Sequence, residues 1–266
     1  MPANELALPH MFAAKAAPTP IVIAALTGIE MPASHSLPRF WVVIPAAGSG
    51  MRMGAAVPKQ YLPLAGRTVI EHSMARLAAL PGVAGLVVAL ATDDPYWPTL
   101  KLQLGVPVQR ITGGSERCHS VLAALTWLLG VAEANDWVLV HDAARPCVRR
   151  ADLQRLLDTL ADDPIGGLLA IPARDTKKRA DANGRILSTV DRTDLWKAQT
   201  PQMFRLGALH EALSRAIAAG VLVTDEASAM EYAGLMPRLV EGHSDNIKIT
   251  RPEDLMLAEF YIAQQD

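Results

Sequence analysis

The first group of residues that could do chemistry is a glycine-rich segment with cations close behind it. It reads Pro45-Ala-Ala-Gly48-Ser-Gly50-Met-Arg52-Met53 and is followed by Pro58-Lys59-Gln60. Small residues let the backbone approach a phosphate, and successive N–H groups can then cradle it. The segment lacks the Gly-Lys-Ser/Thr end of a P-loop, and Met53 stands where a dinucleotide fingerprint needs a small residue. Arg52 and Lys59 suit a triphosphate that develops charge during transfer, or they are ordinary surface charges.

A second polar cluster, His141-Asp142-Ala-Ala-Arg145-Pro146, follows the apolar run Trp137 to Val140. A carboxylate at the end of a buried strand could help to hold Mg²⁺, whose other ligands are phosphate oxygens and water. Arg145 could bind a phosphate through two N–H groups, or it could pair with Asp142 and only order the loop. A histidine that ends a buried strand, such as His141, is more often structural than a general base.

Two further polar segments complete the set. Gly113-Gly114-Ser115-Glu116-Arg117 opens a predicted helix, where backbone N–H groups favour an anion or the polar edge of a base. Asp245-Asn246-Ile247-Lys248 adds one more carboxylate and one more cation. Either segment could also be ordinary turn chemistry.

These clusters follow strands in a chain that alternates strands with helices. Short apolar runs predict strands at Phe40 to Ile44, Leu86 to Ala91, Val106 to Ile111, Trp137 to Val140, Leu168 to Ile171, Arg238 to Val240 and Ile247 to Ile249. Helices are predicted at Thr68 to Leu80, Glu116 to Leu129, Asp152 to Ala161, Leu206 to Ala219 and Asp225 to Tyr232, with a last helix capped by Thr250-Arg-Pro-Glu253. The alternation predicts one α/β domain in which helices cover both faces of a single, mostly parallel sheet. Such sheets bind ligands at the carboxyl ends of their strands.

The polar segment from Ala173 to Arg192 interrupts this alternation. It is rich in charged residues on both sides of an Asn183-Gly184 pair. Asn-Gly between short runs predicts a β-hairpin. Because the segment is too polar for the inside of the sheet, we expect a solvated excursion or an arm that contacts a partner subunit.

The composition excludes several classes of function. Half of the 266 residues are hydrophobic, 20% are charged and the net charge is −2. This is a globular composition without the basic excess of a protein that binds nucleic acid through a broad charged surface. No apolar run is long enough to span a membrane, so we expect no membrane association. Cys118 and Cys147 are too few for a disulfide framework and indicate reduced thiols in a cytoplasmic protein.

Residues 1–38 differ from the rest of the chain. They are rich in proline and carry few charges, so we expect a poorly ordered extension ahead of a domain at 39–266. Met31 is a second possible start, eight residues before Arg39. Our hypothesis is that translation begins at Met31, and the mass of the protein made from its native gene would test it.

Taken together, the segments resemble the 2-C-methyl-D-erythritol 4-phosphate cytidylyltransferases of the non-mevalonate isoprenoid pathway. The resemblance covers about residues 39–263 and rests on the order and spacing of the motifs. Besides the motifs quoted above, it includes Arg174-Asp-Thr176, Val190-Asp-Arg192, Thr200-Pro-Gln202, Thr224-Asp-Glu-Ala-Ser-Ala229 and Thr250-Arg-Pro-Glu253.

The resemblance implies a Rossmann-like nucleotidyltransferase fold that transfers CMP from CTP to 2-C-methyl-D-erythritol 4-phosphate and releases pyrophosphate. By motif position it implies catalytic roles for Arg52, Lys59, Arg192 and Lys248. It implies that CTP contacts Ala46, Ala47, Gly48, Gly50, Gly114, Ser115, Ser120, Asp142 and Ala143, and that the sugar phosphate contacts Arg145, Thr176, Thr200 and Thr224. It also implies Mg²⁺ or another divalent cation at Asp142 and Asp245. Finally, it implies a homodimer whose β-arm, at about 173–192, reaches the site of the other subunit.

The residue types agree with this chemistry. The attacking group would be a phosphate monoester, whose second pKa is about 6, so it is largely ionised without a protein base. Because two anions must meet, catalysis should rest on cations and alignment. Arg52 and Lys59 would stabilise charge on the α-phosphate and the departing pyrophosphate, whereas Arg192 and Lys248 would hold the attacking phosphate in line.

Three other interpretations remain open. The nearest is a cytidylyltransferase of the same fold that uses ribitol 5-phosphate, although His141 to Cys147 looks more like the methylerythritol enzymes. A catalytically silent CTP-binding module is disfavoured by the four cations together, and pyrophosphate release would exclude it. An NAD-dependent oxidoreductase lacks the third small residue of its fingerprint.

Overall fold

A seven-stranded sheet forms the centre of the molecule, with the strand order β11-β7-β10-β6-β1-β4-β5. The computed structural model describes residues 39–48 and 57–265. The strands are β1 (Phe40–Pro45), β4 (Val83–Leu90), β5 (Val108–Thr112), β6 (Trp137–Val140), β7 (Gly166–Pro172), β10 (Trp196–Arg205) and β11 (Arg238–Glu241). Neighbours run parallel except at β10, which is antiparallel to both β6 and β7. The predicted mostly parallel sheet is therefore confirmed.

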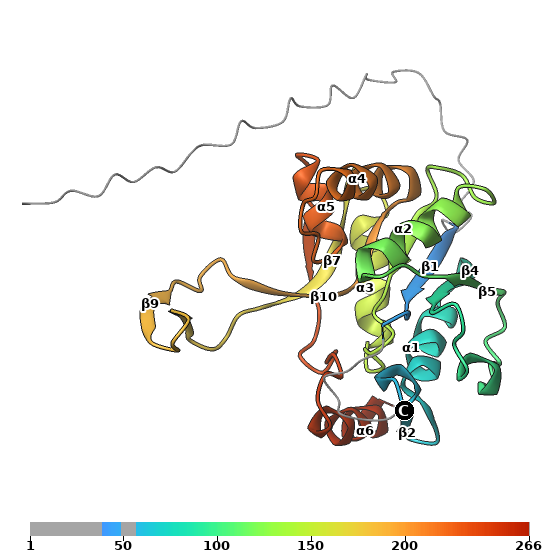
Figure 1. Ribbon diagram of the computed structural model, residues 1–266, viewed down its shortest axis with the longest axis horizontal. Helices are drawn as coiled ribbons and strands as arrows, with labels where there is room; N and C mark the ends of the chain where they lie inside the picture. Colours follow the sequence, from blue (N-terminus) through green and yellow to red (C-terminus); the bar gives the residue numbers. More distant parts are fainter. Residues whose placement is uncertain (1–38, 49–56, 266) are drawn as a thin grey trace, which may run out of the picture.

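Helices cover both faces of this sheet (Figure 1). They are α1 (Val69–Ala78), α2 (Arg117–Leu128), α3 (Arg150–Leu160), α4 (Leu206–Ala218), α5 (Glu226–Tyr232) and α6 (Glu253–Gln265). Alternate side chains of β1 enter different cores, because successive residues of a strand point to opposite faces. Phe40, Val42 and Ile44 pack with α1 and α3, whereas Trp41 and Val43 pack with α2, α4 and α5. Burial on both faces explains why the sequences of β1, β4 and β6 are continuously apolar.

Shorter elements fill in the body around the sheet. A 3-10 turn, η2 (Lys59–Tyr61), precedes a small ribbon of β2 (Pro63–Leu64) and β3 (Arg67–Thr68), and η3 (Trp97–Thr99) follows β4. A third core joins α6 to Leu64, Val69, Ala144 and Cys147. Within the described residues, no helix combines the length and the apolar character needed to cross a bilayer.

Strand β10 was not predicted, although it lies near the middle of the sheet. Its sequence places Gln199, Thr200 and Gln202 in buried positions, so it lacks the apolar signature of a core strand. Pro201 also argues against a central strand, because proline cannot donate to the ladder. The pairing of β10 with β7 is interrupted between Ala198 and Gln202, where this proline lies.

Two predictions near the C-terminus were wrong. Ile247 to Ile249 is a loop rather than a strand. Its apolar side chains belong to the third core, in which Ile249 is fully buried. The predicted capping pair of Thr250 and Glu253 does not form: the Asp254 carboxylate instead accepts from the backbone N–H groups of Thr250 and Arg251. The helix itself is present and begins at Glu253, whereas the capping box predicted a start directly after Thr250.

The predicted hairpin is present as a separate two-stranded sheet of β8 (Lys177–Ala180) and β9 (Ile186–Val190). The Asp181 carboxylate closes its turn by accepting from the N–H groups of Asn183 and Arg185, at 2.9 and 2.8 Å. The hairpin extends away from the body in Figure 1. Its apolar residues Ile186 and Leu187 are 66% and 63% exposed, so it is not folded back onto a core.

A test of the sheet arrangement uses Gly167 in β7. A Cβ atom at this position would overlap the carbonyl oxygen of Arg238 in β11. Gly167→Ala should therefore separate the two strands and lower the free energy of unfolding by about 1–3 kcal/mol, the usual cost of overpacking. Urea unfolding measures the change. Gly130→Ala is the control with a milder contact, because the nearest atom, the Trp127 carbonyl oxygen at 3.3 Å, would have to shift only slightly; equal stability of the two variants would contradict the packing of β11 on β7.

Candidate active site

A pocket of about 250 Å³ lies where the parallel strands β1 and β6 end. Its walls come from the loops after these strands, from the start of α2 and from the segment before α6. The lining residues are Pro45, Ala46, Ala47, Gly48, Lys59, Gln60, Gly114, Ser115, Glu116, Arg117, Ser120, Asp142, Ala143, Ala144, Lys248 and Thr250. The carboxyl edge of the sheet thus carries the pocket, at the place where α/β sheets bind their ligands.

Most of the residues expected at the nucleotide line this pocket. They are Ala46, Ala47, Gly48, Gly114, Ser115, Ser120, Asp142 and Ala143, together with the cation Lys59. Lys248, which was expected to hold the attacking phosphate, also lines the pocket. Gly50 and Arg52 lie outside the described residues, so their roles stay predictions. The other predicted residues, Arg145, Thr176, Arg192, Thr200, Thr224 and Asp245, are not among the lining residues.

Gln60 fixes the start of the glycine-rich segment. Its amide Nε2 donates to the carbonyl oxygens of Ala46 and Gly48, at 2.9 and 3.0 Å, and its side chain is buried. The neighbouring Lys59 ammonium donates to the carbonyl oxygen of Ile249 at 2.9 Å. Sequence reasoning assigned no role to Gln60, and its place beside Lys59 was the only available signal.

The loop before α2 comes so close to the helix that glycine is required. A Cβ atom on Gly114 would overlap the Cβ of His119. Ser120 accepts from the Gly114 N–H at 3.1 Å and is almost fully buried, so it holds the loop from inside. Ser115 is exposed at the rim, 3.1 Å from Nδ1 of His119. This end of the pocket therefore offers backbone groups and hydroxyls, which suit a base and a ribose better than a phosphate.

Asp142 is surrounded by cations. Its Oδ1 accepts from Nε of Arg117 at 3.0 Å, and its Oδ2 contacts Lys248 Nζ at 2.9 Å and Arg145 Nε at 3.2 Å. Burial alone would raise the pKa of Asp142, but Arg117, Lys248 and Arg145 hold this pKa well below its ordinary value. The carboxylate stays ionised and gives the cations a fixed anchor.

Arg145 is placed differently from expectation. Its guanidinium is buried, donating to Asp142 and, at 2.7 Å, to the carbonyl oxygen of Asn246. It therefore orders the loop, which was the alternative left open by its proximity to Asp142 in sequence. The predicted direct phosphate contact of Arg145 does not fit this geometry.

The two carboxylates expected to hold a divalent cation do not form a ready-made metal site. Both oxygens of Asp142 are already paired with cations. Asp245 does not line the pocket; its Oδ2 contacts Arg149 at 2.6 Å and Gln265 at 3.0 Å, while its Oδ1 is buried without a hydrogen-bond partner in the described residues. These two carboxylates do not form a preformed cation site in this structure, and we derive no step through a metal.

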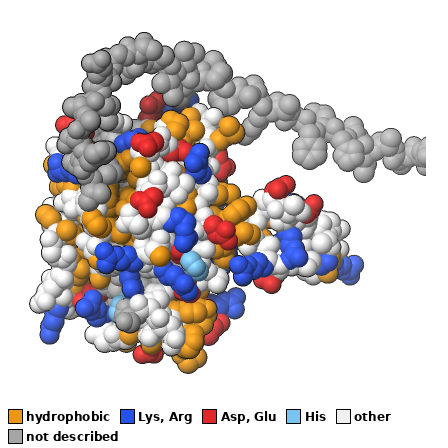
Figure 2. Space-filling model, turned by 180° about the vertical axis from the view of Figure 1, so that it is seen from behind, with side chains coloured by type: hydrophobic (Ala, Val, Ile, Leu, Met, Phe, Trp, Pro, Cys, Tyr) orange, Lys and Arg blue, Asp and Glu red, His pale blue; other side chains and the backbone are white. Residues whose placement is uncertain are grey.

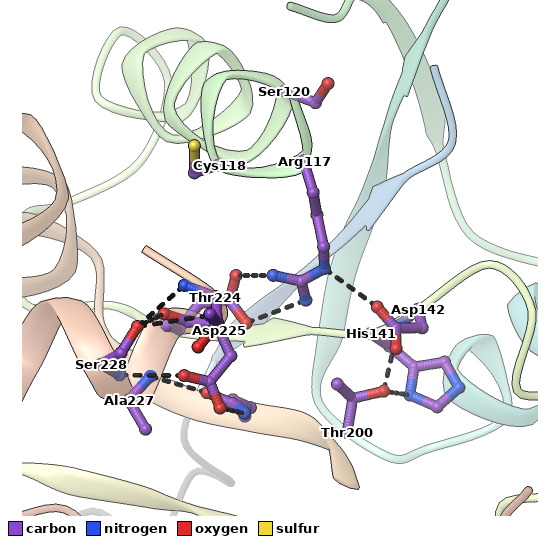
Figure 3. A network of polar contacts seen from close by, with 12 residues as sticks. Arg117, Cys118, Ser120, His141, Asp142, Thr200, Thr224, Asp225, Ala227 and Ser228 are labelled. Carbon is purple, nitrogen blue, oxygen red and sulfur yellow. Dashed lines mark hydrogen bonds and ion pairs between the residues drawn. The ribbon is translucent and has the colours of Figure 1, made fainter. Parts of the chain in front are cut away.

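His141 and Thr200 form a buried pair that supports Asp142 (Figure 3). The Thr200 hydroxyl accepts from the Asp142 N–H and donates to Nδ1 of His141, both at 3.0 Å. Nε2 of His141 must then donate to the carbonyl oxygen of Arg145, also at 3.0 Å. Burial lowers the pKa of His141 to about 4. His141 is thus a neutral structural residue, and Thr200 positions the loop rather than presenting its hydroxyl to the pocket.

Arg117 connects Asp142 to a partner far away in the sequence. Its Nη1 and Nη2 donate to the two carboxylate oxygens of Glu226, at 2.6 and 3.0 Å. Figure 3 shows this guanidinium between Asp142 and the start of α5. The sequence analysis missed this pair, because an ion pair between distant segments leaves no local pattern.

Three of the residues expected on the acceptor side are exposed. Thr176 and Arg192 lie at the two ends of the hairpin, and Thr224 precedes α5. The backbone N–H of Thr224 donates to the hydroxyl of Ser228 at 3.2 Å, which ties this residue to the first turn of the helix. Within the described residues of a single chain, these three do not join the pocket lining.

Residues 40–264 match the family model described as 2-C-methyl-D-erythritol 4-phosphate cytidylyltransferase. Curated relatives with this name include one from Pseudomonas putida (strain GB-1), 61% identical over 222 residues that cover 83% of this chain and 94% of the relative. Another, from Pseudomonas aeruginosa (strain UCBPP-PA14), is 63% identical over 224 residues, covering 84% and 96%. A crystal structure of 4-diphosphocytidyl-2C-methyl-D-erythritol synthase superposes with a TM-score of 0.73 at 36% identity, covering 85% of this chain and 98% of that one. The cytidylyltransferase structure from Thermus thermophilus gives 0.69 at 31%, covering 85% and 99%.

The neutral state of His141 predicts a pH dependence of stability. Its pKa is about 4 in the folded protein against an ordinary value of 6.5, so between these values the unfolded chain binds more protons. The free energy of unfolding should therefore fall as the pH falls, by on the order of 2 kcal/mol from this group between pH 7 and pH 5. Urea unfolding of wild type and His141→Gln at both pH values isolates the contribution. An identical pH dependence in the two proteins would contradict the assignment.

Proposed function

The chain belongs to the 2-C-methyl-D-erythritol 4-phosphate cytidylyltransferase family, and we propose that it transfers CMP from CTP to 2-C-methyl-D-erythritol 4-phosphate. The products are 4-diphosphocytidyl-2-C-methyl-D-erythritol, a precursor in isoprenoid biosynthesis, and pyrophosphate. One observation carries the proposal: small-residue loops and cations from separate segments of the chain line a single pocket.

The pocket residues divide by chemistry into two ends. Gly114, Ser115 and Ser120 supply the polar groups for cytosine and ribose. The backbone at Ala46 to Gly48 and the ammonium group of Lys59 would bind the triphosphate, and Lys248, which lines the same pocket, would hold the attacking phosphate. A divalent cation would arrive with the phosphate oxygens of CTP, since Mg²⁺ commonly binds through substrate phosphates.

The chemistry requires no protein base at this site. The acceptor phosphate has a second pKa of about 6 and is already a nucleophilic dianion at neutral pH. His141 follows β6 directly, but it is fully buried and both of its ring nitrogens are occupied by internal partners. Positioned cations, which stabilise the charge that develops on the phosphates, would therefore supply most of the catalysis.

The exposed hairpin suggests where the acceptor site is completed. A second cavity, of about 1000 Å³, lies at the base of the hairpin and is lined in part by Arg155, Arg174, Lys177 and Lys197. Lys and Arg side chains continue from the middle of the body onto the hairpin in Figure 2. The apolar residues Ile186 and Leu187 also face solvent in the single chain. These features support a homodimer in which the hairpin brings Arg192 to the pocket of the other subunit.

The proposed activity is tested by pyrophosphate release from CTP with a panel of polyol phosphates. Release should require 2-C-methyl-D-erythritol 4-phosphate. Release with ribitol 5-phosphate instead would identify the alternative enzyme of the same fold. If the protein bound CTP but released no pyrophosphate with any acceptor, it would be a CTP-binding module without catalytic activity.

The first test of whether the pocket cations contribute to catalysis is a substitution of Lys59. Removal of its ammonium by Lys59→Ala should lower kcat by about 10²–10³-fold, the scale of losing one preorganised electrostatic contact. The affinity for CTP should change much less if Lys59 acts mainly on the transition state. Lys101→Ala, an exposed lysine away from the pocket, is the matched control. If Lys59→Ala kept the wild-type kcat, Lys59 would be an ordinary surface charge.

Subunit complementation tests whether Arg192 acts across the dimer. Lys59→Ala removes an ammonium group from the pocket of its own chain, and Arg192→Ala removes a guanidinium group from the hairpin. In a heterodimer, one site then combines an intact pocket with an intact hairpin. Random exchange makes about half of the dimers mixed, so roughly a quarter of all sites should regain activity under two-fold assembly.

The measurement is pyrophosphate release after the two variants are unfolded, mixed and refolded. Arg185→Ala, in the turn of the same hairpin, is the control for loss of a hairpin charge and should be active alone. If Arg192 served its own chain, every site in the mixture would carry a lesion. Absence of recovery, with heterodimers confirmed by mass, would therefore reject the shared site.

A further inference from the structure

Glu226 is a buried carboxylate that does not itself line the pocket. It lies in the first turn of α5, and only 1% of its surface is exposed. Both of its oxygens accept from Arg117, at 2.6 and 3.0 Å. Such a two-bond pair fixes the plane of the guanidinium as well as its position.

Through Arg117, this carboxylate is connected to a cation of the pocket. Nε of Arg117 contacts Oδ1 of Asp142 at 3.0 Å, and Oδ2 of Asp142 contacts the Lys248 ammonium at 2.9 Å. Arg117, Asp142 and Lys248 all line the pocket. The four charged groups therefore form one alternating chain that runs from α5 to Lys248, the pocket cation that would hold the attacking phosphate.

The start of α5 is itself held rigidly against the sheet. Gln202, which is buried in β10, donates to Oδ2 of Asp225 and accepts from the N–H of Ala227, at 2.9 and 2.8 Å. These two residues flank Glu226 on either side. The sheet therefore determines where the Glu226 carboxylate lies, and Glu226 in turn determines where Arg117 lies.

We propose that Glu226 is a positioning residue of the transfer reaction, which acts through Arg117 and Asp142 to hold the Lys248 ammonium in place; this rests on the function proposed above. Without the carboxylate, two of the N–H donors of Arg117 lose their charged acceptor. Arg117 then turns toward Asp142 or toward the pocket, and the Asp142–Lys248 contact shifts with it. Misplacement of a reacting or stabilising group by about 1 Å can cost 10²-fold in rate.

Glu226→Gln tests the proposal with little change in side-chain volume. We expect kcat to fall by about 10- to 100-fold. The KM for CTP should stay within about threefold or decrease, because the loss of a negative charge leaves the pocket more positive. Glu226→Asp keeps the charge but shortens the side chain, so it should also lower kcat. Wild-type kcat in both variants would overturn the proposal.

A double-mutant cycle shows whether Glu226 acts through Arg117. Arg117→Lys keeps a positive charge but loses the planar two-bond pair. If the path runs through Arg117, adding Glu226→Gln to Arg117→Lys should cost little further kcat. If the two substitutions lowered kcat independently, so that their fold-changes multiplied in the double variant, the proposed path through Arg117 would be overturned. Met230→Ala, which leaves a cavity under α5 without touching the ion pair, controls for general loosening of this helix. If Met230→Ala reproduced the fall in kcat below its unfolding temperature, the role of Glu226 would be merely structural.

A last measurement does not depend on the proposed function. Acetic anhydride labels lysines according to their freedom to react, and mass spectrometry reads each site. Lys248 should be labelled faster in Glu226→Gln and Glu226→Asp than in wild type, while exposed Lys101 is labelled equally in all three. Unchanged labelling of Lys248 would overturn the positioning role even if the wild-type enzyme proved to use another acceptor.

Discussion

The carboxylate of Asp142 is a charge that the fold has removed from water and surrounded with cations. Only 6% of this residue is exposed, and an isolated carboxylate at such a position would cost several kcal/mol. Arg117 comes from the first turn of α2, Arg145 from the loop after β6 and Lys248 from the segment before α6. Because each cation must remain near Asp142, the positions of these three segments are tied to one another. The need to keep cations beside the buried Asp142 carboxylate therefore fixes the segments that form the walls of the pocket.

The same pairing orients the positive charge of the pocket before any nucleotide binds. Lys248 is held by Asp142, and Lys59 donates to the carbonyl oxygen of Ile249. In the cluster of Arg117, Arg145, Lys248, Asp142 and Glu226, the cations outnumber the carboxylates by one. An incoming anion therefore meets cations that are already held in place by the protein. Groups fixed in this way require no reorganisation when charge develops in the transition state, which is the main advantage of a protein site over water.

Features encoded by neighbouring residues were predicted correctly from the sequence, whereas contacts between residues far apart in the sequence were not. Trp137 to Val140 forms a strand with the predicted bounds, because a run buried on both faces is apolar throughout. The Asn183-Gly184 turn was likewise predicted from adjacent residues. The pair of Arg117 and Glu226 joins positions 109 residues apart and has no local pattern. The family motifs located Arg145 and Thr200 near the site, but they could not show that both side chains are turned to internal partners.

Strand β10 shows why the least predictable element is also the one that organises the site. Its buried polar side chains do not contribute to an apolar core, and their burial is favourable only when they are hydrogen-bonded. Thr200 supports Asp142 and His141, whereas Gln202 fixes the start of α5. Because β10 runs antiparallel to β6, with Gln202 opposite Val140, these side chains lie at the carboxyl edge, beside the loops that they orient. A strand that had kept an apolar pattern would have been easier to predict, but it would have supplied no donors or acceptors to the loops. The departure from the local pattern and the formation of the pocket therefore have one cause, which is expected where a fold serves a site.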